Sequence, residues 1–561
     1  MADTISTAPD ESGRLTHNQI MLILSGLLLG MFLAALDQTI VSAAMRTIAD
    51  KLHGQTNQAW ATTAYLVTST VSTPLYGKLS DMYGRKKFYL FAISIFLVGS
   101  VLSGMSTSMG ELASFRAIQG LGAGGLMALA FAIIADIVSP RERAKYQGYF
   151  MAVFGLSSVA GPVLGGLLAG QSRLLGFDGW RWVFYVNVPI GIVALIVVSR
   201  FLNIPHVRKN HKVDYTGALL LVLGVTSLLL VAEQGRTWGW GSGKSLACYV
   251  IGVVLLVGFV WQERKVGDEA ILPLKMFNSP VFSVASLLNF IIGMGMFGGI
   301  ICLPLYMQIV KGFSPTKSGL SLLPLMLGLM VFAMSSGIFT SKTGRYKMFP
   351  IFGTGILIAA LFGLSRISYT TPYSHLAPLM FVVGAGLGCC MQTLVLATQN
   401  SVSASQMGVA TSSATFFRSM GGTFGTAVFL TIFFSGATSK VGSNVQAAAQ
   451  TPQFQTALRD PANSAIARVL QAMQGGSTSQ LNDTSFLQHG AKVLREPFLS
   501  GFAGAMDRVF LVAALVVIPA FVLSFFLKEV KLRTESGLEA QAAERRRQAE
   551  LREAQAQHAG L

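Results

Sequence analysis

The stretch Gly77-Lys-Leu-Ser-Asp-Met-Tyr-Gly-Arg-Lys-Lys87 recurs later in the chain as Gly337-Ile-Phe-Thr-Ser-Lys-Thr-Gly-Arg-Tyr-Lys347. Both copies fit the pattern Gly-x-x-x-x-x-x-Gly-Arg-x-Lys, and each follows the second apolar segment of a block of six such segments. Two related blocks of membrane helices are typical of secondary transporters, whose substrate and ion sites lie near the membrane midplane between the halves. The repeat therefore predicts a chain built from two similar halves.

The composition is that of a membrane protein. Of the 561 residues, 52% are hydrophobic and 12% are charged, whereas a soluble domain carries about 25% charged residues. The net charge of +17 comes from Lys and Arg residues that lie mostly in short loops and the C-terminal tail, so we expect no nucleic-acid partner. The cysteines lie in apolar segments without the spacing of a metal site or a disulfide framework. They are Cys248, Cys302, Cys389 and Cys390.

Hydropathy predicts an all-α integral membrane protein with fourteen transmembrane helices, as two six-helix halves plus two inserted central helices. At ~1.5 Å rise per residue, the first segment is long enough to cross a hydrocarbon core of ~30 Å. The expected spans are residues 20–44, 59–79, 88–106, 111–137, 146–170, 183–203, 215–233, 246–262, 282–309, 318–341, 348–367, 375–398, 407–435 and 505–527.

These spans divide the chain into five parts. They are a cytoplasmic N-terminus (1–17), an N-terminal six-helix half (18–204), two inserted helices with linkers (205–278), a C-terminal six-helix half (279–530) and a cytoplasmic tail (531–561).

The C-terminal half includes a polar outer loop, residues 438–500. Its apolar residues suggest short amphipathic helices on the outer face, divided at Pro461. A mobile surface loop is an equally good interpretation of this region. The apolar residues are Phe454, Leu458, Ile466, Val469, Leu470 and Met473.

Basic residues predict the orientation. If the N-terminus is cytoplasmic, the inner loops hold sixteen Lys and Arg residues and the short outer loops hold nine. Cytoplasmic loops are enriched in Lys and Arg. We therefore expect a multi-pass protein of the plasma membrane with both termini in the cytoplasm.

Three formal charges lie deep inside the expected spans, at Asp37, Arg116 and Arg418. A charged residue at the bilayer centre costs at least ~2.5 kcal/mol on insertion scales and rarely faces lipid. Buried ion pairs add little net stability, so we interpret these charges as functional. Asp37 is a candidate proton carrier or contact for a cationic substrate, and both arginines are candidate counter-charges. Two further acids, Glu111 and Asp507, lie near the outer ends of spans.

Polar residues in spans of the second half are candidates to line the same cavity. Ordinary interhelical hydrogen bonding is an equally good interpretation of each. They are Asn289, Tyr306 and Gln392.

Several motifs resemble those of the major facilitator superfamily. The first copy of the repeat looks like the loop signature of that family, and the run from Gly161 to Gly166 is similar to the motif associated with its antiporters. Other stretches are similar to its intramembrane arginine motif and to its fourteen-span drug/proton antiporter branch, and the resemblance covers roughly residues 19–528. These stretches are Arg116-x-x-Gln119-Gly120, Leu36-Asp37-x-Thr39-Ile40-Val41, Trp180-Arg181-Trp182, Leu303-Pro-Leu-Tyr306-Met-Gln308 and Phe416-Phe417-Arg418.

The resemblance implies a cytoplasmic latch that holds the outward-facing state. We expect Asp136, which closes the fourth span, to pair with Arg85. A solvated basic loop would explain the lysines of this loop but not an acid between two placed glycines. In the second copy Ser341 replaces the acid, so the two halves cannot latch identically. The expected latch residues are Gly77, Asp81, Gly84, Arg85 and Asp136.

In the fifth span, the resemblance assigns a run of small residues to antiport. Proline removes a backbone donor and invites a kink, and glycines let a neighbouring helix approach closely. Structural packing alone is the alternative interpretation. The residues are Gly161, Pro162, Gly165 and Gly166.

The resemblance implies a proton-driven exporter of amphipathic or cationic drugs that works by alternating access. We expect a monomer that contacts substrates, protons and membrane lipids. The alternatives are a dedicated lipid or metabolite exporter of the same fold and a non-transporting membrane sensor. We expect no enzyme, metal or cofactor: the sequence shows no nucleophile–base pair, and the glycine run from Gly120 to Gly125 lies inside a span, not after a strand. The proton gradient would then be the energy source.

Overall fold

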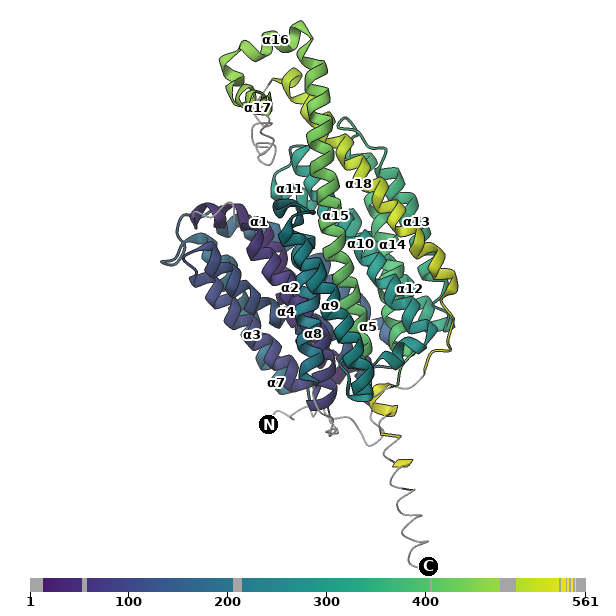
Figure 1. The fold of residues 1–561 in the computed structure, drawn as a ribbon. Helices are drawn as coiled ribbons and strands as arrows, with labels where there is room; N and C mark the ends of the chain where they lie inside the picture. Colours follow the sequence, from purple (N-terminus) through teal and green to yellow (C-terminus); the bar gives the residue numbers. More distant parts are fainter. Residues whose placement is uncertain are drawn as a thin grey trace, which may run out of the picture.

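The computed structural model describes residues 14–52, 58–204, 214–403, 406–474 and 491–533, with parts of 536–550. Within these residues the chain is helical, apart from loops and an isolated bridge between Leu174 and Phe177. The long helices form one bundle (Figure 1). The N-terminal half consists of α1 (His17–Lys51), α2 (Gln58–Tyr83), α3 (Arg85–Met105), α4 (Met109–Ile137), α5 (Pro140–Ala169), α6 (Trp182–Tyr185) and α7 (Asn187–Phe201).

The inserted helices and the C-terminal half complete the bundle. The insert consists of α8 (Tyr215–Trp238) and α9 (Gly243–Val266). The C-terminal half consists of α10 (Pro280–Ile309), α11 (Pro315–Leu320), α12 (Leu323–Thr343), α13 (Met348–Leu364), α14 (Tyr373–Asn400), α15 (Met407–Ala449), α16 (Pro452–Arg459), α17 (Ser464–Gln474) and α18 (Lys492–Phe526).

Eleven of the described helices are long and apolar enough to cross a membrane. Two shorter apolar helices, Pro280–Met296 and Met348–Leu364, accompany them. Each expected span falls on a described helix. The prediction of an all-helical, multi-pass membrane protein is therefore confirmed.

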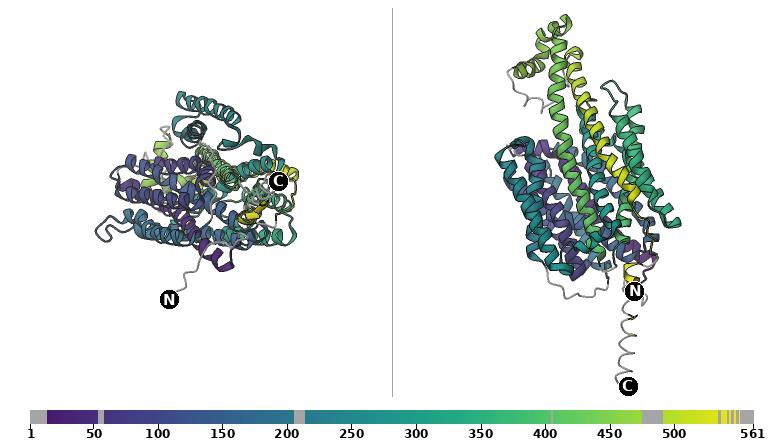
Figure 2. Two further views of the ribbon diagram at one scale, coloured as in Figure 1. Left: turned by 90° about the horizontal axis from the view of Figure 1, so that it is seen from below. Right: turned by 45° about the vertical axis from the view of Figure 1, so that its right-hand side comes forward.

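The helices that contain the last two expected spans are much longer than those spans. α15 runs on to Ala449 and has 43 residues, about 65 Å at ~1.5 Å per residue, or roughly twice a hydrocarbon core. α18 begins at Lys492 instead of near residue 505. The two extensions pack closely against each other: a Cβ added at Gly501 would lie only 2.5 Å from Val441 Cγ2. They rise above the bundle as a hairpin (Figure 2, right).

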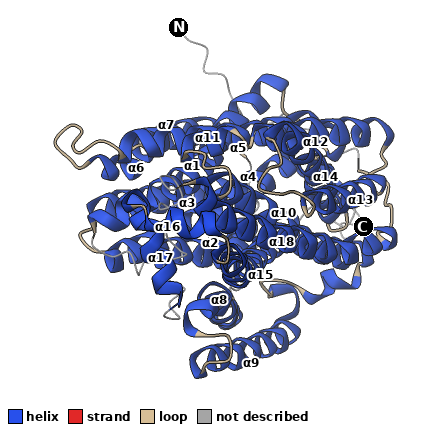
Figure 3. Ribbon diagram, turned by 90° about the horizontal axis from the view of Figure 1, so that it is seen from above, coloured by secondary structure: helices blue, strands red, loops and turns tan. Residues whose placement is uncertain are grey.

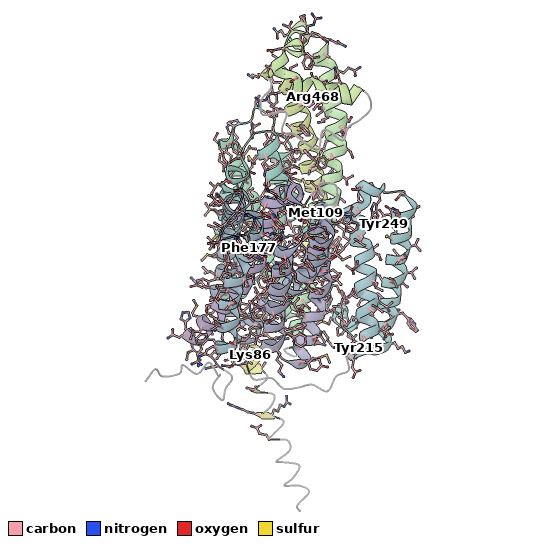
Figure 4. The ribbon with its side chains drawn as sticks, turned by 90° about the vertical axis from the view of Figure 1, so that its left-hand side faces the viewer. Lys86, Met109, Phe177, Tyr215, Tyr249 and Arg468 are labelled. Atoms are coloured by element: carbon pink, nitrogen blue, oxygen red, sulfur yellow. The ribbon has the colours of Figure 1, made fainter. Side chains whose placement is uncertain are left out.

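Two amphipathic helices cap this hairpin. The predicted pair is confirmed as α16 and α17, separated by a 3-10 turn at Pro461–Asn463. Their apolar residues turn inward, with Phe454 and Ile466 almost fully buried. They lie well above the bundle instead of on its outer face, since α15 and α18 extend so far; Arg468 of α17 marks the level in Figure 4.

The inserted helices lie along one side of the bundle. α8 packs against α2 and α15, and α9 is the outermost helix (Figure 3). Val225 and Leu229 of α8 share one buried cluster with Val71 of α2 and Ala410 of α15. α8 therefore contacts both halves. The outer side of α9 exposes apolar residues such as Val254, as a helix facing lipid requires.

The two ends of the bundle differ. α1 begins and α18 ends at the same end, where Lys86 is labelled in Figure 4. We call this the latch end, because both copies of the repeat lie there. The opposite end carries the hairpin with α16 and α17 and is called the hairpin end.

Candidate functional site

Asp37 lies midway along α1 and is fully buried in the N-terminal half. Its Oδ2 accepts a hydrogen bond from Arg116 of α4 at 2.5 Å. Its Oδ1 accepts from Gln119 Nε2 of α4 and from Asn187 Nδ2 of α7, each at 2.8 Å. Asn187 also donates to Ser100 Oγ of α3 at 3.0 Å. Three helices therefore meet on one carboxylate, and Asn187 links it to a fourth; we call these residues the Asp37 network.

These contacts explain how the charge is tolerated inside a membrane helix. A buried charge needs both a counter-charge and hydrogen bonds, and Asp37 has both. The guanidinium of Arg116 also lies over the Tyr65 ring, 4.1 Å from its centroid, which adds a cation–π attraction. Within the described residues, Arg116 Nε and Asn187 Oδ1 have no partner. The network thus keeps one unused donor and one unused acceptor.

The sequence named only part of this network. It predicted that Asp37 and Arg116 belong together but did not assign Gln119 or Asn187 to the site. One signal was available, because Gln119 follows Arg116 by three residues and so shares its helix face. The contribution of Asn187 from α7 depends on how distant helices pack.

Two other cavity candidates remain without partners. Arg418 of α15 is 9% exposed, and among the described residues no side chain forms an ion pair or hydrogen bond with its guanidinium. Gln392 of α14 is 3% exposed, and its Oε1 has no partner in the described chain. Neither residue contacts Asp37 in this arrangement.

The remaining two candidates are satisfied locally. Asn289 Nδ2 donates to Ala285 O of its own helix at 2.9 Å. Tyr306 OH donates to Ser368 O, in the loop after α13, at 2.8 Å. The structure therefore places Tyr306 toward the hairpin end of the C-terminal half, away from the Asp37 network.

The expected latch residues meet at the latch end. Arg85 binds Asp136 Oδ2 through Nε at 2.7 Å and Asp81 Oδ1 through a terminal nitrogen at 2.5 Å. It also donates to Ser80 Oγ at 2.6 Å. Asp81 Oδ2 accepts from the backbone N–H of Val409 at 3.0 Å. Val409 is in the first turn of α15, so Asp81 caps a helix of the opposite half.

Glycines make this contact possible. A Cβ at Gly408 would lie 2.2 Å from an Arg85 nitrogen and 2.5 Å from Asp81 Oδ1, and one at Gly77 would lie 2.0 Å from Ser412 Oγ. Either side chain would push α2 and α15 apart. Gly84, which precedes α3, has φ of 105°, a conformation that glycine adopts without steric cost.

A second contact between the halves lies beside the latch. Arg143 of α5 donates to Gln399 Oε1 of α14, and Gln399 Nε2 donates to Thr411 Oγ1 of α15 at 2.8 Å. Arg143 also reaches Ala135 O at 3.1 Å. Burial lowers the pKa of Arg143 to about 10, and nearby Asp136 opposes this, so it stays charged at neutral pH. From sequence this arginine looked like an ordinary basic loop residue.

The small residues of α5 join it to α1. A Cβ at Gly161 would lie 2.1 Å from Thr39 Oγ1, and one at Gly165 would lie 2.7 Å from Ile40 O. Thr39 Oγ1 donates to Ser157 O at 2.9 Å. The motif of the first span and that of the fifth span are thus in direct contact, two residues from Asp37.

The same part of α5 also faces the C-terminal half. A Cβ at Gly319 of α11 would lie 2.9 Å from Pro162, and one at Gly166 would lie 3.7 Å from Thr316 Oγ1. α5 is therefore packed closely both against α1 within its own half and against α11 of the opposite half.

The sequence profile of the Major Facilitator Superfamily matches residues 27–426. The chain belongs to the Major Facilitator Superfamily. It is 36% identical over 515 residues to an uncharacterised MFS-type transporter of Mycobacterium tuberculosis, covering 91% of this chain and 70% of that protein. It is 33% identical over 516 residues to Multidrug resistance protein 3 of Bacillus subtilis, covering 91% and 96%. A multidrug transporter of the same species is also 33% identical, covering 93% and 96%.

Solved structures agree on the fold. A proton:xylose symporter superposes with a TM-score of 0.56 at 15% identity, covering 93% of this chain and 99% of the symporter. At that identity the likeness speaks for the fold alone. Together these findings make the protein an MFS transporter homologous to multidrug and efflux transporters, and members of this family are typically not enzymes.

Proposed function

We propose that the protein is a proton-driven exporter, an antiporter that moves amphipathic or cationic drugs outward by alternating access. The observation that carries this proposal is the fully buried Asp37–Arg116 pair in the transporter's first half. Retaining a buried ion pair contributes little stability, so a role in coupling accounts for it better. The relatives named as multidrug transporters support the cargo class.

The coupling step follows from the geometry of the Asp37 network. Arg116 stays charged at every physiological pH, so a proton can enter the network only at Asp37. Protonation would cancel the attraction to Arg116 and free both side chains. Because Asp37 is fully buried, the proton reaches it only after the surrounding helices have moved. Substrate and proton would then favour different arrangements of the halves.

The topology we propose has fourteen spans. The eleven candidates, the two shorter apolar helices and α2, whose many Thr and Ser residues lower its hydropathy, make up that number. The latch end with both termini would face the cytoplasm of a plasma-membrane protein. We propose a monomer in contact with membrane lipids, with the proton gradient as energy source and no cofactor.

The buried charges bear on the cargo. Arg116 neutralises Asp37, whereas within the described residues no side chain pairs with the buried Arg418. An arginine without a counter-charge would repel a cationic cargo beside it and attract an anionic one. A substrate panel should therefore include organic cations, organic anions and neutral dyes.

The test uses purified protein in lipid vesicles with an imposed pH gradient. We expect dye transport that depends on the gradient and is lost in Asp37→Asn, because the neutral amide cannot exchange a proton. Asp178→Asn, at a half-exposed carboxylate outside the spans that lies 3.7 Å from its neighbour Arg181, is the matched control and should transport normally. Robust gradient-driven transport by folded Asp37→Asn protein would sink the proposal.

The hairpin end favours one second candidate, a dedicated lipid or metabolite exporter. α15 and α18 extend far beyond the bundle, which would suit the transfer of cargo to a partner outside. The same vesicles distinguish the two functions when labelled lipid replaces dye. Lipid flux without dye flux would favour this candidate, and absence of any flux would favour a sensor.

A further inference from the structure

The chain that leaves α18 is fastened beneath the C-terminal half. Tyr346, which follows the second Gly-Arg pair, is fully buried. Its hydroxyl donates to Lys528 O at 3.0 Å and accepts from Val530 N at 3.1 Å. Its backbone N–H donates to Glu529 Oε1 at 3.0 Å. One tyrosine thus binds three successive residues of the segment.

A second anchor lies at the end of α14. Asn400 Nδ2 donates to Lys531 O at 3.2 Å, and its Oδ1 accepts from Arg533 N at 3.2 Å. Arg533 donates in turn to Val402 O at 2.5 Å. Leu532, between these contacts, is 3% exposed. Side chains that satisfy irregular backbone in this way fix one course for the chain.

Beyond residues 534 and 535, which lie outside the described part, the segment contacts the N-terminal half. Ser536 and Glu539 form a reciprocal capping box, with Ser536 N donating to Glu539 Oε2 at 2.7 Å and Glu539 N to Ser536 Oγ at 3.1 Å. Gly537 lies on the end of α4, where a Cβ would be 3.0 Å from Asp136 Cα and 3.2 Å from Asp136 Oδ1. Leu538 is 5% exposed.

The segment also reaches the start of the chain. Glu539 Oε1 accepts from Arg14 Nε at 2.7 Å, just before α1. The hydrogen bonds from Ser536 and Arg14 hold the pKa of Glu539 below its ordinary value, although burial alone would raise it. The carboxylate is therefore charged at neutral pH.

We propose that residues 528–533 and 536–540 form a strap across the latch end, the first part anchored to the C-terminal half by Tyr346 and Asn400 and the second resting on the latch acid Asp136 of the N-terminal half. Opening of this end separates those anchors, so the strap must first leave one of them. Gly537 positions Asp136 by covering it, which favours its pairing with Arg85. The inference rests on the proposed alternating-access cycle and adds a tail-dependent control to it.

The test measures opening directly, without transport. Spin labels on Lys87→Cys and Lys342→Cys, exposed in opposite halves at the latch end, report the separation by double electron–electron resonance in a background without other cysteines. Removal of residues 534–561 takes away the contacts to Asp136 and Arg14. We expect the population at long distance to rise about fivefold relative to the full chain, as loss of a few contacts predicts.

Two further proteins make the result specific. Removal of residues 542–561 leaves the strap intact and should match the full chain. Tyr346→Phe loses the anchoring hydroxyl but keeps the buried ring, and should shift the distribution as the longer truncation does. An unchanged ratio of the two populations in both strap variants would overturn the strap. If every protein shows a single population of label distances, at any pH and with any dye, both the strap and the rocking cycle are overturned. If the latch end opens normally but dye is not transported, only the proposed function is affected.

Discussion

The two copies of the repeat have the same spacing and opposite surroundings. In the first copy, the buried Arg85 pairs with Asp81, and Asp81 binds the backbone of Val409 across the interface between the halves. In the second copy, Ser341 carries no charge and Arg345 is exposed to solvent. The glycines differ as well: Gly84 begins α3, whereas Gly344, with φ of 74°, ends α12. One spacing therefore supports a latch in one half and an ordinary turn in the other.

The difference extends to the helix that begins opposite each copy. α15 has no side-chain cap of its own, and Asp81 from the other half binds its first turn. α5 supplies its own cap, because Ser139 Oγ accepts from Glu142 N at 3.4 Å. The start of α15 therefore depends on a side chain of the opposite half, whereas the start of α5 does not. If the latch end opens as proposed, the contact of Asp81 with α15 must break, whereas the cap of α5 can stay intact.

The largest difference between the two copies should come from their arginines, Arg85 and Arg345. Arg85→Ala removes the guanidinium that pairs with both Asp81 and Asp136; breaking a buried pair in this way costs about 3–5 kcal/mol and should strongly favour the open latch end. Arg345→Ala, at the same position of the second copy, should have no measurable effect. The Lys87–Lys342 label pair measures both. Equal shifts of the label distance in the two variants would show that both copies stabilise the closed latch end.

The next largest effect should come from the close approach of α15 to Arg85 and Asp81. Gly408→Ala places a methyl group against Arg85 and Asp81, and overpacking of this kind costs about 1–3 kcal/mol. Gly442→Ala is the control on the same helix, since no atom lies within 4 Å of a Cβ at Gly442. The label distances should lengthen in the first variant alone. If Gly408→Ala keeps the closed distance, the latch does not depend on this contact.

The sequence predicted the fold well because membrane helices carry strong local signals. Each expected span falls on one or two described helices, and the repeat marked the latch end. The ends of α15 and α18 were not predicted, since the hydropathy of α15 falls at residue 435 while its helix continues. Hydropathy reports where lipid contact ends; helix packing between Val441 and Gly501 decides where the helix ends.

The candidate site was predictable where charges stand out. Asp37 and Arg116 were named because buried charges are costly and so noticeable, and the latch residues were named because their loop resembles a family signature. Gln119, Asn187 and Arg143 were not, because their partners come from distant helices and polar or basic residues are common. The strap had one visible clue, the capping box of Ser536 and Glu539. Its contacts to Tyr346 and Asn400 depend on folding across more than a hundred residues.

A smaller effect isolates the charge of the latch. Asp81→Asn keeps an oxygen that can accept from Val409 N but loses the negative charge that faces Arg85 and the start of α15; the interaction with the helix terminus alone is worth about 1 kcal/mol. Its counterpart is Ser341→Asp, which restores the acid in the second copy. Because α5 already caps itself, we expect no further closure from this change. A clear gain of the closed population in Ser341→Asp would mean that the missing acid alone explains the asymmetry.

The smallest effect should come from the outer end of the strap. Arg14 is largely exposed, and exposed ion pairs contribute only about 0.2–1 kcal/mol, so Arg14→Ala should shift the label distances much less than Arg85→Ala. The pKa of Glu539 lies below its ordinary value of 4.5. An acid whose pKa is lowered in the folded state contributes its full stability at any pH above its ordinary pKa. This contribution is lost as the pH falls through the lowered pKa. The effect of Arg14→Ala should therefore be the same at pH 6 and pH 8. A larger effect at pH 8 would mean that Glu539 takes up a proton in this range, and that its hydrogen bonds from Ser536 do not persist in the membrane.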